Sequence, residues 1–217
     1  SNYDKRKCNK IHFIIIHYTA LKDYKKALFH LCDKKNKVSS HFLISQDGEI
    51  FSLVNVKHRA WHAGISYWEN FKDINSFSIG IELDYSLNKK NNKFTVKMID
   101  SLKRLLKVLM KKYQIKRYNV LAHSDIAPSR KIDPGPKFPW HKLSKSQLSF
   151  MPNKKLFNKI LIVKEWLKKN KISSKKNVVL FLLFLIGYDI SEAYKDRKIF
   201  KKILINYQSH FLQKNIT

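Results

Sequence analysis

The chain has 217 residues, 44% of them hydrophobic, with only five glycines and five prolines, which excludes a disordered or fibrous class and indicates one or two globular domains. Lysine and arginine outnumber the acidic residues by 44 to 16, giving a formal net charge of +28. Of these 44 basic residues 38 are lysine, which lacks the bidentate fork of arginine. A generic solvated surface is therefore the favoured interpretation of the charge, an acidic polymer ligand comes second, and a nucleic acid comes last.

Neither targeting nor membrane crossing is indicated. The first ten residues are too polar for a signal peptide, although the sequence is also compatible with a signal or anchor that has been removed. The apolar run Val178–Ile186 would reach about 14 Å as a helix against a hydrocarbon core of about 30 Å, so it predicts a buried helix rather than a span, with interfacial membrane contact as the alternative. Two cysteines do not make a disulfide framework in a chain this long.

The first third of the chain predicts three strands and a helix. Residues 11–17 alternate apolar side chains and are rich in β-branched types, which is typical of a central strand that ends at His17. A helix is expected at 23–33. Residues 41–54 predict two strands joined by a hairpin turn at Asp47-Gly48.

The middle of the chain predicts two more strands and a long helix. In the strand at 77–84, Gly80 and Glu82 share a face, which suits the floor of a cleft. Apolar residues recur at every third and fourth position from Thr95 to Gln114, as in an amphipathic helix. A last short strand, 119–122, is followed directly by His123.

After a polar stretch at 144–155 that reads as a linker, only helices are expected, near 154–170, 175–186 and 191–212. The predicted fold is therefore α/β, a mixed central β-sheet flanked by helices, with a small C-terminal helical domain. The predicted domains are residues 1–150 and 151–217.

Three candidate ligands suggest a zinc site. His17 and His123 each lie where a predicted strand ends, and Asp133 follows in the proline-rich segment 129–143. Strand ends on one edge of a sheet open into the same crevice, so the three side chains could meet there. Two imidazoles and one carboxylate would leave a fourth position of a tetrahedral zinc site for water, whose pKa falls to about 7.

Two further residues could complete a hydrolytic site. Lys131 lies on the same rigid segment as Asp133, and its ammonium could stabilise a negative oxygen that develops at an amide carbonyl. Glu82 could accept the proton of the water and pass it to the departing nitrogen.

Spacing alone leaves this assignment open, because a histidine at a strand end is more often packed or hydrogen-bonded than a ligand. Of nine histidines, His41 is a possible neighbour of the ligands. The remaining histidines outside the proposed site are expected to be structural: His12, His30, His58, His141 and His210.

Five motifs resemble one enzyme family in order and spacing. They are IIIHYTA, VSSHFLISQDGEIFSLV, RAWHAGISYW, NSFSIGIELD and VLAHSDIAPSRKIDPGPKFPW, which together cover residues 11–143. They resemble the zinc-dependent N-acetylmuramoyl-L-alanine amidases, and the AmiD type more than the AmpD type. That group shares its fold with the peptidoglycan recognition proteins and phage T7 lysozyme.

The resemblance implies one Zn²⁺ per chain, held by His17, His123 and Asp133, with Glu82 as the catalytic glutamate and Lys131 as the oxyanion-stabilising lysine. It also implies a substrate wall made by Arg59, Trp61, His62 and Ala63. The expected reaction is hydrolysis of the amide between N-acetylmuramic acid and L-alanine in peptidoglycan or muropeptides. The alternative is a protein that binds peptidoglycan without cutting it, although such relatives characteristically lack a zinc ligand.

Residues 151–217 resemble, more weakly, a three-helix peptidoglycan-binding domain, with Asn206-Tyr207-Gln208 where the family has Ala-Phe-Gln. A purely structural helical cap is the competing interpretation. We expect a cell-envelope, periplasmic location, with no nucleic-acid partner, no transmembrane segment and no obligate protein partner.

Overall fold

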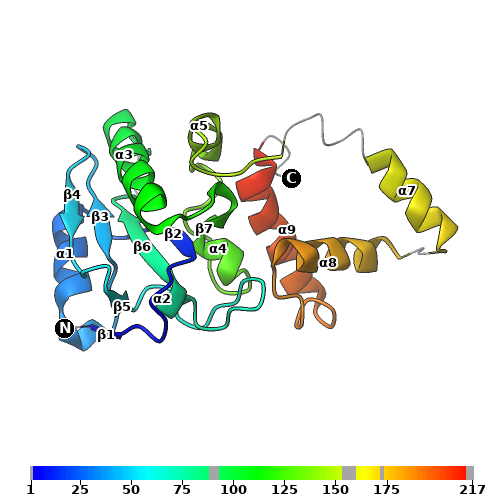
Figure 1. The fold of residues 1–217 in the computed structure, drawn as a ribbon, viewed down its shortest axis with the longest axis horizontal. Helices are drawn as coiled ribbons and strands as arrows, with labels where there is room; N and C mark the ends of the chain where they lie inside the picture. Colours follow the sequence, from blue (N-terminus) through cyan, green and yellow to red (C-terminus); the bar gives the residue numbers. More distant parts are fainter. Residues whose placement is uncertain (1, 88–92, 153–159, 172–173, 214–217) are drawn as a thin grey trace.

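A five-stranded mixed sheet forms the centre of the computed structural model, which describes residues 2–87, 93–152, 160–171 and 174–213 (Figure 1). The strand order is β4-β3-β6-β2-β7, and all neighbours are parallel except the β3–β4 hairpin. The strands are β2 (Phe13–Tyr18), β3 (Phe42–Ile44), β4 (Ile50–Ser52), β6 (Ser78–Leu83) and β7 (Val120–Ala122). The predicted mixed α/β architecture is confirmed.

Strand β2 is buried on both faces, as its apolar alternation predicts. Ile14 and Ile16 pack into one hydrophobic cluster with helix α3 (Val96–Tyr113), while Phe13 and Ile15 belong to a second cluster on the opposite face. The alternation of side chains along a strand therefore builds two cores, one on each side of the sheet.

Helix α3 covers the first face and matches its predicted range closely. It begins after Thr95, whose hydroxyl accepts a hydrogen bond from the Met98 amide at 3.1 Å, and it ends at Gln114 in a left-handed conformation. A side-chain cap of this kind satisfies one of the amide donors that a helix start leaves unpaired.

Short elements complete this part of the chain. Strands β1 (Tyr3–Lys5) and β5 (His58–Ala60) form a separate antiparallel pair in two segments for which the sequence predicts no strand. Residues 144–145, predicted to open a linker, instead end helix α5 (Trp140–Lys145), and Leu148 just beyond them is buried. The short helices are α1 (Tyr24–Cys32), η1 (Lys34–Asn36), α2 (Ile74–Phe77), η2 (Arg117–Asn119), α4 (His123–Ile126) and α5 (Trp140–Lys145).

The C-terminal helices pack unequally. Helices α8 (Lys175–Ile186) and α9 (Arg197–Phe211) contribute Leu180, Leu183 and Ile203 to the second core, whereas α7 (Ile160–Lys169) stands apart from the body (Figure 1). The predicted start of the first of these helices, 154–159, lies outside the described residues. The division into domains at residue 150 stays a prediction, and α8 and α9 share their core with the sheet.

The prediction of a buried helix at Val178–Ile186 is wrong for most of its surface. Leu180 and Leu183 are 2% exposed, but five neighbours are open to solvent: Phe181, Leu182, Phe184, Leu185 and Ile186. One side of α8 packs against the body of the protein, and no other described residues cover its remaining surface. A continuous apolar run has no periodicity, so the sequence cannot distinguish the buried side from the exposed side. None of the helices in the described ranges is long and apolar enough to cross a membrane.

Candidate metal centre and cleft

A cleft of about 340 Å³ lies at the C-terminal ends of the central strands. His17 on β2 is in direct register with Glu82 on the parallel neighbour β6, so both side chains point to the same face of the sheet. His123 begins α4 where β7 ends, and Lys131 and Asp133 reach the same cleft from the loop that follows α4.

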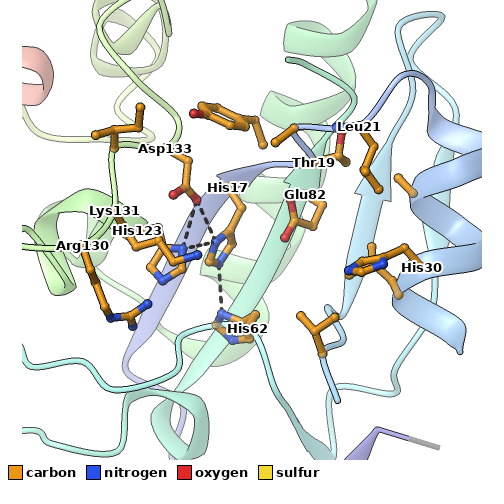
Figure 2. Close-up of a pocket in the computed structure, with 16 residues that line it drawn as sticks. His17, Thr19, Leu21, His30, His62, Glu82, His123, Arg130, Lys131 and Asp133 are labelled. Carbon is orange, nitrogen blue, oxygen red and sulfur yellow. Dashed lines mark hydrogen bonds and ion pairs between the residues drawn. The ribbon is translucent and has the colours of Figure 1, made fainter. Parts of the chain in front are cut away.

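Three buried side chains converge at the floor of this cleft (Figure 2). The Nδ1 atoms of His17 and His123 are 2.9 Å apart, and Oδ2 of Asp133 lies 3.2 Å from the first and 3.0 Å from the second. Ligand atoms around a tetrahedral zinc ion, with bonds of about 2.0–2.2 Å, are separated by about 3.3–3.5 Å. The three atoms therefore need little movement to share one ion.

Hydrogen bonds at the far side of each ring decide which nitrogen faces the centre. Nε2 of His123 lies 3.1 Å from the Ala63 carbonyl, which can only accept, so this nitrogen carries the proton. Ser78 donates its hydroxyl to the Ile74 carbonyl and therefore accepts from Nε2 of His62, which leaves Nδ1 of His62 to accept from Nε2 of His17 at 3.0 Å.

In the neutral tautomers that these bonds select, both inward-facing Nδ1 atoms are lone-pair acceptors, and the Asp133 carboxylate is a third. Three such acceptors aimed at one another form a set that can bind a cation. Two nitrogen donors and one oxygen donor suit zinc, so the residues present fit the ion that the sequence predicted.

Burial and neighbouring groups shift the pKa values of His17 and Asp133 in the directions that favour binding of a cation. Burial, and then the neighbouring His123, lower the pKa of His17 to about 4, so this ring is neutral at pH 7. Burial alone would raise the pKa of Asp133, but His123 and His17 outweigh it and hold that pKa well below its usual range. The loop carrying Asp133 is joined to α4 by a hydrogen bond from the Ser124 amide to the Asp133 carbonyl, at 3.0 Å.

Gly80 makes room for the ring that supports His17. A Cβ atom built at Gly80 would lie 2.5 Å from Cγ of His62, closer than any real contact. The sequence singled out this glycine as part of a cleft floor. Its main effect in the structure is to let His62 lie flat against β6 and reach His17.

Glu82 and Lys131 both line the cleft beside the three converging side chains. Glu82 is buried, its Oε2 atom is among the described buried side-chain atoms that have no hydrogen-bond partner, and burial followed by the charge of Asp133 raises its pKa to about 8. A carboxyl group in this state is poised to exchange a proton near neutral pH. Lys131 is half-buried, and its charge acts on both His17 and Glu82.

The four residues predicted to form a substrate wall are divided by the structure. His62 lines the cleft, and the carbonyl of Ala63 accepts from His123. Arg59 and Trp61 are not among the residues lining the cleft, and both bond to Asp4, Arg59 also to Asp73. Their contact with substrate stays a prediction.

Arg130 lines the cleft, although the sequence analysis assigns it no role. Its guanidinium donates to the Ala63 and Ile65 carbonyls and so ties the loop of Lys131 to the segment that carries His62. Its place directly before Lys131 was the available signal. His41 is buried and hydrogen-bonds the Gly80 amide and the His58 carbonyl rather than a candidate ligand.

Known proteins match both the sequence and the fold. Residues 7–136 match the family model described as N-acetylmuramoyl-L-alanine amidase. The chain is 35% identical over 215 residues to N-acetylmuramoyl-L-alanine amidase AmiD of Escherichia coli, covering 93% of this chain and 75% of AmiD. It is 43% identical over 107 residues to 1,6-anhydro-N-acetylmuramyl-L-alanine amidase AmpD of Haemophilus influenzae, covering 49% of this chain and 56% of AmpD.

Two solved structures cover nearly the whole chain. E. coli AmiD, in complex with the substrate anhydro-N-acetylmuramic acid-L-Ala-D-γ-Glu-L-Lys, aligns with a TM-score of 0.80 at 32% identity over 98% of this chain and 86% of that one. AmpDh3 of Pseudomonas aeruginosa, in complex with anhydromuramic pentapeptide, aligns with a TM-score of 0.82 at 29% identity over 98% and 88%. The family match, the identity to AmiD and the shared fold together establish that this chain belongs to the N-acetylmuramoyl-L-alanine amidase family.

Proposed function

We propose that this protein is a zinc-dependent amidase that hydrolyses the bond between N-acetylmuramic acid and the L-alanine of the stem peptide in peptidoglycan or muropeptides. Family membership supports the reaction class. The observation that carries the metal dependence is the convergence of two Nδ1 atoms and one carboxylate oxygen, all buried, at the floor of a cleft.

His17, His123 and Asp133 would hold one Zn²⁺. A zinc ion bound by three protein ligands supplies a water of lowered pKa and polarises a carbonyl oxygen. The chain's own contribution is to hold both rings with Nδ1 toward the centre, through the Ala63 carbonyl behind His123 and the His62 ring behind His17.

Glu82 would act as the general base and acid. Its unpartnered Oε2 atom can accept a proton from the attacking water, and its raised pKa favours holding that proton until the amine leaves. Lys131 would donate to the oxygen that becomes negative as the amide carbonyl is attacked. This role is supported by Lys131 lining the same cleft as the three candidate ligands, on the loop that carries Asp133.

The net charge of +28 would draw in a substrate whose stem peptide carries carboxylates. The solved relatives hold anhydromuramoyl peptides, so an anhydromuropeptide is the first substrate to assay. A cell-envelope, periplasmic site of action is part of the same proposal.

The direct test is release of free stem peptide from purified anhydromuropeptide, followed by mass spectrometry. The zinc-loaded protein should produce intact peptide and the free sugar acid, and protein stripped by a chelator should produce neither until zinc is restored. Full activity of rigorously zinc-free protein would refute the metal dependence, and cleavage at a different bond would refute the substrate assignment.

A non-catalytic peptidoglycan-binding role is not favoured, because all three candidate ligands are present and converge. Replacing Glu82 by Ala separates the two roles. Binding to insoluble peptidoglycan should persist, while turnover should fall by about 10² to 10⁴ if Glu82 transfers the proton. Unchanged turnover would remove Glu82 from the mechanism.

A further inference from the structure

Helix α9 reaches back to the loop that carries Lys131 and Asp133. Three side chains from this end of the chain donate hydrogen bonds to five backbone carbonyls of that loop. Asn206 donates to Pro128 and Lys131, Lys202 to Ser129, and Gln213 to Pro136 and Phe138. The loop is therefore held by residues more than 70 positions away in the sequence.

The loop depends on such outside donors because it makes few bonds of its own. Pro128, Pro134 and Pro136 have no amide hydrogen, and the turn at 127–131 is closed by hydrogen bonds from the Arg130 and Lys131 amides to the single carbonyl of Ala127. Buried carbonyls without a partner are costly, so a donor that reaches them determines where the turn sits.

Asn206 differs from the other two donors in burial and position. It is 4% exposed, and its single side-chain nitrogen donates to Pro128 O at 3.0 Å and to Lys131 O at 3.1 Å, so it spans the turn that ends at Lys131. Lys202 makes an exposed contact, which water can replace at little cost. Asn206 is thus the one buried donor among the three.

A second buried contact fixes the helix that makes these bonds. Asp125, two residues after His123, is fully buried and accepts from the Tyr188 hydroxyl and from Nδ1 of His210, each at 2.6 Å. His210 lies one turn beyond Asn206 and stacks on Trp140 at 3.6 Å between ring centroids. Helix α9 is therefore anchored on the catalytic side of the sheet and can transmit a fixed position to the loop.

We propose that Asn206 is a positioning residue that holds Lys131 in reach of the reacting carbonyl, which makes α9 a working part of the active site. The proposal rests on the function proposed above, because it acts through the role of Lys131. A small displacement of a group that stabilises the transition state lowers turnover far more than it lowers substrate binding. Loss of Asn206 should therefore lower kcat and leave KM nearly unchanged.

A double-mutant cycle between Asn206→Ala and Lys131→Ala tests this on muropeptide hydrolysis. Asn206→Ala should lower kcat about 10-fold, with KM changed less than about 2-fold, and should have no further effect once Lys131 is already alanine. The matched control is Ser209→Ala, another buried polar residue of α9, whose hydroxyl donates to the Ile205 carbonyl within the same helix. It should leave kcat unchanged.

An equal loss of kcat from Asn206→Ala with and without Lys131 would overturn the proposal, and so would a kcat equal to that of the control. If Asn206→Ala does not fold, Asn206→Ser, which keeps one donor, enters the same cycle. Hydrogen exchange at residues 127–133 tests the contact without turnover. Exchange should rise in the Asn206 variant and not in the control, and unchanged exchange would overturn the proposal even if the chain cleaved a different substrate.

Discussion

Replacing Gly80 by alanine should weaken zinc binding, although none of the three candidate ligands is changed. The added methyl group would lie 2.5 Å from Cγ of His62, whereas ordinary contacts begin near 3.4 Å, so the ring must move by about 1 Å. The 3.0 Å hydrogen bond from Nε2 of His17 to His62 would then be lost. Loss of an outer partner of a zinc-bound histidine typically costs 10- to 100-fold in metal affinity. The backbone of Gly80 has no left-handed torsion, so the effect comes from this contact.

Competition with a coloured zinc chelator measures this change, and circular dichroism confirms that the variant is folded. We expect the zinc Kd of Gly80→Ala to rise about 10- to 100-fold. The control is the same substitution made with His62→Ala, where the space is already vacated and the methyl group should cost nothing more. Unchanged zinc affinity in Gly80→Ala, or an equal loss in both backgrounds, would refute the reasoning.

Three further perturbations address the neighbouring residues. In the zinc-free protein the pKa of Glu82 rises from 4.5 to about 8 on folding, so the free energy of unfolding should fall as the pH rises across that interval. Glu82→Gln should remove this fall, so the variant should be more stable than the wild type by a few kcal/mol at pH 8 and by little at pH 4.5. A stability difference in urea unfolding that does not change with pH would contradict this prediction. Lys131→Ala should lower kcat about 10²- to 10³-fold in muropeptide assays, and a loss confined to KM would assign Lys131 to binding. Tyr188→Phe removes a donor from buried Asp125 and should cost about 2 kcal/mol in thermal or urea unfolding, which an unchanged midpoint would exclude.

The sequence predicted those parts of the fold whose burial pattern is local. The alternation of apolar residues at 11–17 and their spacing at 95–114 indicate which faces are buried. The structure has strand β2 in the first segment and helix α3 in the second. Strands β1 and β5 have three residues each and pair across more than 50 positions, so neither carries a pattern of its own. Their formation depends on the tertiary fold.

The convergence of the candidate ligands could be anticipated in part, because strand ends meet at one edge of the sheet, whereas their choice among nine histidines came from the family resemblance. His17 and His123 each stand where a predicted strand ends, and the structure brings both next to Asp133. The support behind them could not be anticipated in the same way. His62 reaches His17 only because a loop folds over Gly80, and Asn206 reaches Lys131 only because α9 packs against the sheet. Such contacts are set by packing between distant segments and leave no periodic signal.

The apolar run in α8 illustrates the opposite failure. Nine consecutive apolar residues predict burial, yet within the described part of the chain only Leu180 and Leu183 of this run are fully buried. When a helical segment is apolar on every side, its sequence does not indicate which side packs against the rest of the protein. The number of buried faces is decided by what packs against it, and α7 stands apart.

The most direct measurement is the rate of muropeptide cleavage as zinc is added stepwise to the metal-free protein. The rate should rise linearly and stop rising at one zinc per chain, and Asp133→Ala should show no such rise. Full cleavage before any zinc is added, or an undiminished rise without Asp133, would contradict a single zinc ion held by His17, His123 and Asp133.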